Sequence, residues 1–178
     1  RPGPWRTLGY GGSAYALTTY RDRAGRLVGT AWLRSAVENP PGWAGMLSLP
    51  VLLSAGPDGG VSVRPHPDVD TLRGSPLPAR DGRCALDGVA DLEVELPPGA
   101  TLRLDGGLDL LRDADALVVG RIRVPTRSDR LRVVVDRGVV EAWTGDGRWL
   151  ALRLPYRQVR SAAVLGPGRL AGWSLDRS

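Results

Sequence analysis

The chain has 178 residues, enough for one good-sized core or one domain with part of another, because domains usually run to ~100–200 residues. Its 24 basic residues are all arginine, and they stand against 19 acidic residues. The arginines are scattered beside aspartates and are not gathered into a stripe. A nucleic-acid interface concentrates positive charge, so this pattern indicates solvated strand edges and loops and argues against a nucleic-acid partner.

The sequence also argues against a metal centre, a cofactor and a membrane partner. Cys84 is the lone cysteine and His66 the lone histidine, so we expect no internal disulfide and no Cys/His metal cluster. No apolar run approaches the ~20 residues that cross a bilayer. The opening "RPGPWRT" has neither an initiator Met nor a signal-peptide pattern, which predicts a mature or truncated product and leaves the compartment unknown.

Short apolar runs with period-two alternation, broken by Gly, Pro and Asp, predict an all-β protein of many antiparallel strands. The predicted strands cover residues 14–20, 26–33, 45–53, 60–64, 90–96, 100–104, 117–124, three strands within 131–152, 160–165 and 169–175. Only residues 66–74 suit a helical turn or two, because Pro67 is tolerated at a first helical position and Gly74 is a stop signal.

A change of composition near residues 39–60 divides the chain. One hairpin precedes this Gly- and Pro-rich stretch, whereas the strands after it suffice for two facing sheets. A lone two-stranded hairpin is marginal in water. The first ~45 residues are therefore predicted to be a piece of something larger.

The most regular stretch is "LRVVVDRGVVEAWTGDGRWLAL", residues 131–152. A two-residue loop at Arg137 and Gly138 places Asp136 opposite Val139 and Val134 opposite Glu141. Alternation then predicts one core face and one mixed face. The core face carries Leu131, Val133, Val135, Val140 and Ala142, and the mixed face carries Arg132, Val134, Asp136, Val139, Glu141 and Trp143.

Asp136 and Glu141 are candidates for the acid and base of a glycosidase. As diagonal neighbours they lie ~7–8 Å apart, within the carboxyl separation of inverting glycosidases and beyond that of retaining ones. Catalysis also needs a concave site that drives the two pKa values apart. Arg132 and Arg153 are expected to hold both acids ionised, so structural ion pairs under a flanking loop are favoured. Trp143 and Trp149 are likewise interpreted as packing residues before sugar platforms.

Four segments, in order, resemble glycoside hydrolase family 32, the β-fructosidases. "LGYGGSAYALTTYRDRAGRLVGTAWL" resembles the family's Asp-Tyr-Gly…Phe-Tyr-Ala…Gly-Trp hairpin, and "WAGMLSLPVLLS" resembles its Trp-Ala-Gly…Leu-Pro-Arg-Glu-Leu segment. "VSVRPHPDVDTLRG" is similar to its Arg-Pro-x-x-Glu-x-x-Leu-Arg run, and the stretch from residue 131 is similar to its C-terminal Asp-Arg-Ser…Val-Glu-Val-Phe signature.

This resemblance implies a fold and a division of the chain. Residues 1–54 are expected to be the last-blade remnant of a five-bladed β-propeller with its linker, and residues 55–178 a C-terminal antiparallel β-sandwich. The implied partners are the upstream propeller portion of the parent protein and a fructoside or fructan. Members of the family are often secreted.

The family's catalytic segments are not found here. The only asparagine is Asn39, Cys84 follows Arg83 where the family has Glu, and each Arg-Asp pair precedes Arg, Gly or Ala where the family has Pro. We therefore expect no catalytic residue and no metal ligand in this chain, and no activity on fructosides from the chain alone.

Two aromatic residues are candidate substrate contacts by the same resemblance. Tyr15 and Trp32 match aromatic positions at the sugar-facing end of the last blade, with packing between blade and sandwich as the alternative. The chain departs from the pattern at Gly9, Ser13, Ala14, Val51, Leu52 and Gly138, which leaves the substrate open. The alternative functions are a free-standing fructan-binding module and a subunit-contact module.

Overall fold

The computed structural model describes residues 7–34, 45–56, 59–154 and 159–175. Asn39 lies outside these residues, as do Trp43 and Ala44 of the "WAG" segment. The strands are β1 (Gly9–Tyr10), β2 (Ala14–Arg21), β3 (Leu27–Leu33), β4 (Met46–Leu47), β5 (Val51–Ala55), β6 (Val61–Pro65), β7 (Arg73–Leu77), β8 (Ala79–Arg80), β9 (Arg83–Ala85), β10 (Val89–Glu95), β11 (Thr101–Leu104), β12 (Leu108–Arg112), β13 (Ala116–Val119), β14 (Ile122–Pro125), β15 (Arg130–Asp136), β16 (Val139–Thr144), β17 (Trp149–Arg153), β18 (Ser161–Leu165) and β19 (Arg169–Leu175).

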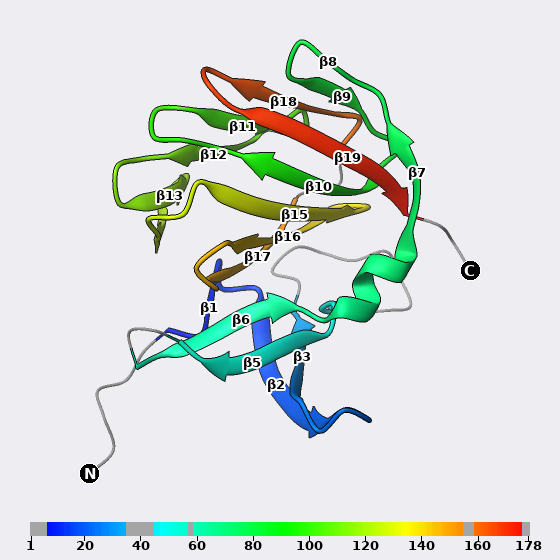
Figure 1. Ribbon diagram of the computed structural model, residues 1–178, viewed down its shortest axis with the longest axis vertical. Helices are drawn as coiled ribbons and strands as arrows, with labels where there is room; N and C mark the ends of the chain where they lie inside the picture. Colours follow the sequence, from blue (N-terminus) through cyan, green and yellow to red (C-terminus); the bar gives the residue numbers. More distant parts are fainter. Residues whose placement is uncertain (1–6, 35–44, 57–58, 155–158, 176–178) are drawn as a thin grey trace.

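These strands form three sheets in three layers (Figure 1). The middle sheet has the order β1-β17-β16-β15-β10-β19-β7, and the outer sheet of the sandwich has the order β14-β13-β12-β11-β18-β9-β8. The third, the blade sheet, is the meander β2-β3-β5-β6 with β4 added to β3. The predicted all-β class is confirmed, and so is a sandwich preceded by a blade.

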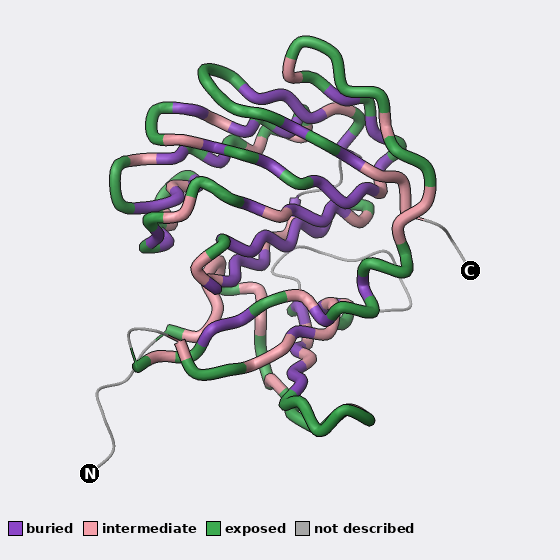
Figure 2. The backbone as a smooth tube through the Cα atoms, viewed as in Figure 1, coloured by how far each residue is buried: buried purple, intermediate pink, exposed green. Residues whose placement is uncertain are grey.

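Both faces of the middle sheet are buried, which explains the apolar character of residues 131–152. Leu131, Val133, Val135, Val140 and Ala142 pack into the core between the two sandwich sheets, as the alternation predicts. The opposite face packs on the blade sheet through a second core, made by Ala31, Leu33, Val51, Val63, Val134, Val139, Trp143, Trp149 and Ala151. All six residues of β16 are therefore buried (Figure 2).

The helical turn predicted at residues 66–74 is a 3₁₀ helix, η1 (Pro67–Leu72). His66 caps it, because its Nδ1 accepts a hydrogen bond from the Asp68 N–H at 3.2 Å. The other ring nitrogen, Nε2, lies 3.1 Å from the Asp22 carboxylate in the β2–β3 turn. The connection from blade to sandwich is thus tied back to the hairpin.

Three strand predictions are corrected by the structure. Residues 117–124 form two strands and not one, because Gly120 has a φ of +57° and turns the chain between β13 and β14. Residues 45–53 are likewise divided between β4 and β5. The blade part is not a lone hairpin, since β5 and β6 extend it to Pro65. This sheet crosses the expected division between residues 54 and 55.

Candidate functional site

The hairpin register predicted for the two candidate acids is confirmed. Asp136 pairs with Val139, and Glu141 pairs with Val134. The turn uses a positive φ at both Arg137 (+51°) and Gly138 (+126°), the geometry of a hairpin loop that matches strand twist. The two carboxylates therefore lie on the same face of the middle sheet, toward the blade.

Glu141 is buried at the interface between the blade sheet and the middle sheet. It is 4% exposed, and its Oε1 accepts a hydrogen bond from the Leu49 N–H at 2.8 Å, next to the blade strands. Its Oε2 accepts one from Trp149 Nε1 at 3.0 Å, on β17. The carboxylate thus links the blade to the sandwich, and no substrate could contact it there.

The prediction that arginines hold both acids ionised is wrong for Glu141. Burial is the largest influence and raises its pKa to about 7, although the hydrogen bonds from Leu49 and Trp149 act in the opposite direction. The Asp136 charge adds to the rise. Arg132 does not pair with Glu141, because its guanidinium is held by Asp91 and Asp70. The expected flanking loop is present over Glu141, since Leu49 lies in the connection between β4 and β5.

Asp91 is a second buried carboxylate in the same row, which sequence reasoning missed. It pairs with Val134 on the side opposite Glu141 and is fully buried. Arg73 Nε lies 2.6 Å from its Oδ2, and Arg132 donates to both of its oxygens at 3.0 and 2.6 Å. Asp91 therefore holds the segment after η1 against the middle sheet.

The surroundings of Arg73 favour its charged form. Burial opposes the charge, but hydrogen bonds to Asp91 and Glu93 outweigh it and raise the Arg73 pKa. The guanidinium also lies over the Trp173 ring, 4.1 Å from its centroid. Trp173 is therefore occupied in packing.

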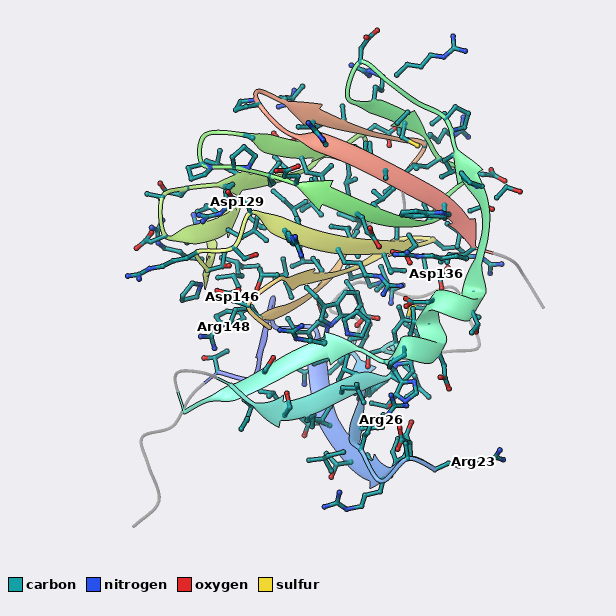
Figure 3. The ribbon with its side chains drawn as sticks, in the orientation of Figure 1. Arg23, Arg26, Asp129, Asp136, Asp146 and Arg148 are labelled. Atoms are coloured by element: carbon teal, nitrogen blue, oxygen red, sulfur yellow. The ribbon has the colours of Figure 1, made fainter. Side chains whose placement is uncertain are left out.

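An open groove of about 1100 Å³ runs between β6 and the middle sheet. Its lining carries four arginines and four acids, namely Arg64, Arg130, Arg132, Arg169, Asp70, Glu93, Glu95 and Asp129. Neither Asp136 nor Glu141 lines it. Figure 3 shows Asp136 and Asp146 at opposite ends of the strands that face the blade. The two candidate acids are therefore not opposed across this groove.

Trp143 and Trp149 are packing residues, as predicted. They are 2% and 1% exposed and belong to the core between blade and sandwich. Neither ring face is open to a sugar. A binding module that holds fructan on these two tryptophans has no support in this geometry.

Tyr15 and Trp32 are brought together at the open edge of the blade. They are cross-strand partners, with ring centroids 6.2 Å apart and planes at 69°. Tyr15 is 55% exposed, and Leu47, the partner of Trp32 on the other side, is 68% exposed. A ligand could reach this row, so substrate contact at Tyr15 and Trp32 stays a prediction.

The "GDG" turn at residues 145–147 contacts β6 at the other end of the interface between the blade sheet and the middle sheet. Val63 N–H donates to the Gly147 carbonyl at 2.9 Å, and an added Cβ at Gly147 would lie 2.0 Å from Ser62 Oγ. We expect Gly147→Ala to destabilise the chain by about 1–3 kcal/mol from its φ of +83° alone, with the clash against β6 in addition.

Gly99→Ala is the matched control for this prediction, measured by urea denaturation. Gly99 has a similar φ of +89°, but nothing lies within 4 Å of an added Cβ. The difference between the two variants therefore reports contact with the blade. Equal losses of stability in the two variants would show that the contact between this turn and β6 adds nothing to the stability of the chain.

Comparisons with known proteins identify the fold. No protein-family model matches the sequence, and no curated protein matches it. Solved structures do match, among them a glycoside hydrolase family 32 protein from Bifidobacterium adolescentis with 22% identity, a TM-score of 0.75 and coverage of 93% of this chain and 32% of that chain. A family 32 β-fructofuranosidase from Bombyx mori has 17% identity, a TM-score of 0.78 and coverage of 97% and 42%.

An exo-inulinase from Aspergillus awamori has 13% identity and a TM-score of 0.80, with 95% of this chain and 44% of that chain covered. The chain thus spans less than half the length of each of these three proteins. The match includes both the blade sheet and the sandwich, because it covers more than nine-tenths of this chain. The chain therefore has the fold of the C-terminal portion of glycoside hydrolase family 32 structures, a propeller blade followed by a β-sandwich.

Proposed function

We propose that this chain is the C-terminal portion of a β-fructosidase-like glycoside hydrolase, in which the sandwich supports the propeller. The hydrolysed bond is the glycosidic bond of sucrose or a fructan, and the catalytic acids are supplied by polypeptide outside these 178 residues. The partners are that upstream propeller portion and the fructoside. The division expected at residues 54 and 55 moves in this proposal to the η1 segment, since β6 belongs to the blade sheet.

One observation carries this proposal: the face of the blade sheet away from the sandwich leaves large apolar side chains uncovered. Its inner face packs on the sandwich through Ala31, Leu33, Val51 and Val63. Of the eight exposed large hydrophobic residues in the described part of the chain, three lie on the other face of the blade, namely Tyr15, Tyr20 and Leu47. Figure 2 shows β2 projecting with most of its length exposed. An apolar sheet face of this kind suits the packing of a preceding blade.

The uncovered face predicts binding of a hydrophobic dye. Tyr20 pairs with Val28 and Leu47 pairs with Trp32, so both follow the even-numbered positions of β3. Alternation places these on the face opposite Ala31 and Leu33, which pack on the sandwich. We expect the Tyr20→Ser/Leu47→Ser variant to bind less anilinonaphthalene sulfonate than the natural chain. Leu111→Ser/Leu165→Ser removes two exposed side chains from the sandwich and is the control. Equal dye binding by both double variants would count against a special blade face.

The activity test uses the chain alone and together with its upstream polypeptide. We expect no release of fructose from sucrose or inulin by the 178-residue chain, and release by the protein that includes the preceding blades. Co-expression of the two parts as separate chains should restore activity if this chain supports the propeller. Fructose release by this chain alone would overturn the proposal.

A further inference from the structure

The groove between β6 and the middle sheet carries charges of both signs, but they are not equally available to a ligand. Three of its four acids already form an ion pair with an arginine. These pairs are Asp70–Arg132 and Glu93–Arg73, both at 2.7 Å, and Asp129–Arg112 at 3.7 Å. Within the described part of the chain, Glu95 is the one acid of the groove without such a pair.

Three of the four arginines of the groove have no carboxylate partner among the described residues. They are Arg64, Arg130 and Arg169, and all three are exposed. Arg64 donates one hydrogen bond, to the Gly145 carbonyl at 3.3 Å. The fourth arginine, Arg132, is held by two carboxylates. The groove therefore offers three arginines to a ligand against one carboxylate.

The sheet register brings these three arginines to one end of the groove. Glu95 on β10 pairs with Arg130 on one side and with Arg169 on the other. Since neighbouring strands are about 4.8 Å apart, the backbones of the two arginines lie roughly 10 Å apart across β10. Gly145, which accepts from Arg64, donates its N–H to the Arg130 carbonyl at 2.8 Å. Together the three arginines form the arginine end of the groove.

The distribution of charge favours a peptide as the ligand. Arginine binds a carboxylate through two parallel N–H donors, which makes the contact strong and directional. An extended peptide advances about 3.3 Å per residue, so carboxylates three positions apart match the spacing of Arg130 and Arg169. A nucleic acid carries a charge at every phosphate, and Asp70, Glu93 and Asp129 would repel it along the rest of the groove. A peptide can place its acids at the arginine end alone.

We propose that the arginine end of the groove binds an acidic segment of a partner protein. Its three arginines take the carboxylates of the segment. Glu95 limits the affinity, because it lies between Arg130 and Arg169 and repels the same carboxylates. The groove lies on the side of the blade sheet that faces the sandwich, so a preceding blade packed on the outer face would leave it open. This interaction is additional to the support of the propeller.

Fluorescence polarisation of a labelled peptide, Glu-Gly-Gly-Glu-Gly-Gly-Glu, tests the proposal with the 178-residue chain at low salt. We expect saturable binding, and none of the same peptide with glutamine in place of glutamate. Arg130→Gln/Arg169→Gln should weaken binding about tenfold, since two charge-assisted contacts are lost. Glu95→Gln should tighten binding about threefold, because it removes a like charge beside the ligand. Loss of the fold could not produce this gain.

Arg80→Gln/Arg83→Gln is the matched control. Both arginines are exposed in the β8–β9 hairpin and have no ion pair among the described residues, so this variant removes the same charge outside the groove. We expect it to bind the peptide as the natural chain does. The proposal fails if the two double variants bind alike, if the peptide does not bind, or if Glu95→Gln brings no gain. A thymidine oligonucleotide of the same charge that binds as tightly would show general attraction of anions and would also overturn it.

Discussion

Replacing Asp91 by alanine is expected to lower the free energy of unfolding by about 3 kcal/mol, measured by urea denaturation at pH 8. The variant leaves Arg73 and Arg132 without the buried carboxylate between them. Breaking a buried ion pair by removing one partner typically costs about 3–5 kcal/mol. The lower end applies because each arginine keeps a second carboxylate nearer to solvent, Glu93 for Arg73 and Asp70 for Arg132.

Two further variants separate this network from ordinary surface charge. Asp109→Ala breaks the exposed Arg103–Asp109 pair and should change stability little, because exposed pairs are screened by water. Replacing Asp91 by leucine together with Arg73 and Arg132 by methionine should recover much of the lost stability, because the desolvation cost of all three charges is removed as well. A fully stable Asp91→Ala protein would show that the network contributes nothing to folding.

The sequence predicted local pairing well because local pairing depends on turn residues. The "DRGV" hairpin has the expected register, since Gly138 permits the loop and the flanking valines alternate. The turn at Gly120 was missed because it interrupts an apolar run, "LVVGRIRV", whose alternation continues on both sides. Periodicity alone does not distinguish one long strand from two short ones when a single glycine is the only sign of the turn.

The role of Asp91 was missed for a different reason. In "ADLEVEL" the apolar residues alternate with Asp91, Glu93 and Glu95, a pattern that normally places the acids in water. Residues of the blade and η1 segments lie over that face. Asp91 is buried beneath them, whereas the side chain of Glu93 stays 55% exposed. Only the arrangement of three layers distinguishes these positions.

Glu141 makes the stability of the chain depend on pH near neutrality. Its pKa is about 7 in the folded chain and 4.5 in its ordinary environment, so between these values the folded state holds a proton that the unfolded state has released. Stability must then fall as pH rises from 4.5 to 7. The expected loss is about 3 kcal/mol, complete above the folded-state pKa.

Asp146 affects stability in a different pH range. Its burial opposes ionisation, but hydrogen bonds from Thr144 and Thr126 outweigh this effect and lower its pKa. Its contribution to stability is therefore lost only as pH falls below about 4.

Glu141→Gln should therefore flatten the curve of unfolding free energy against pH between 4.5 and 7, while Asp146→Asn should leave that part unchanged. Urea denaturation at half-unit pH intervals measures both curves, and His66 is present in all three proteins, so the comparison isolates each acid. Asp136→Asn should shift the Glu141 transition to lower pH, because the Asp136 charge raises the Glu141 pKa. A Glu141→Gln protein with the same slope as the natural chain would mean that this carboxylate is already ionised at pH 5, and that the blade is joined to the sandwich through a charge.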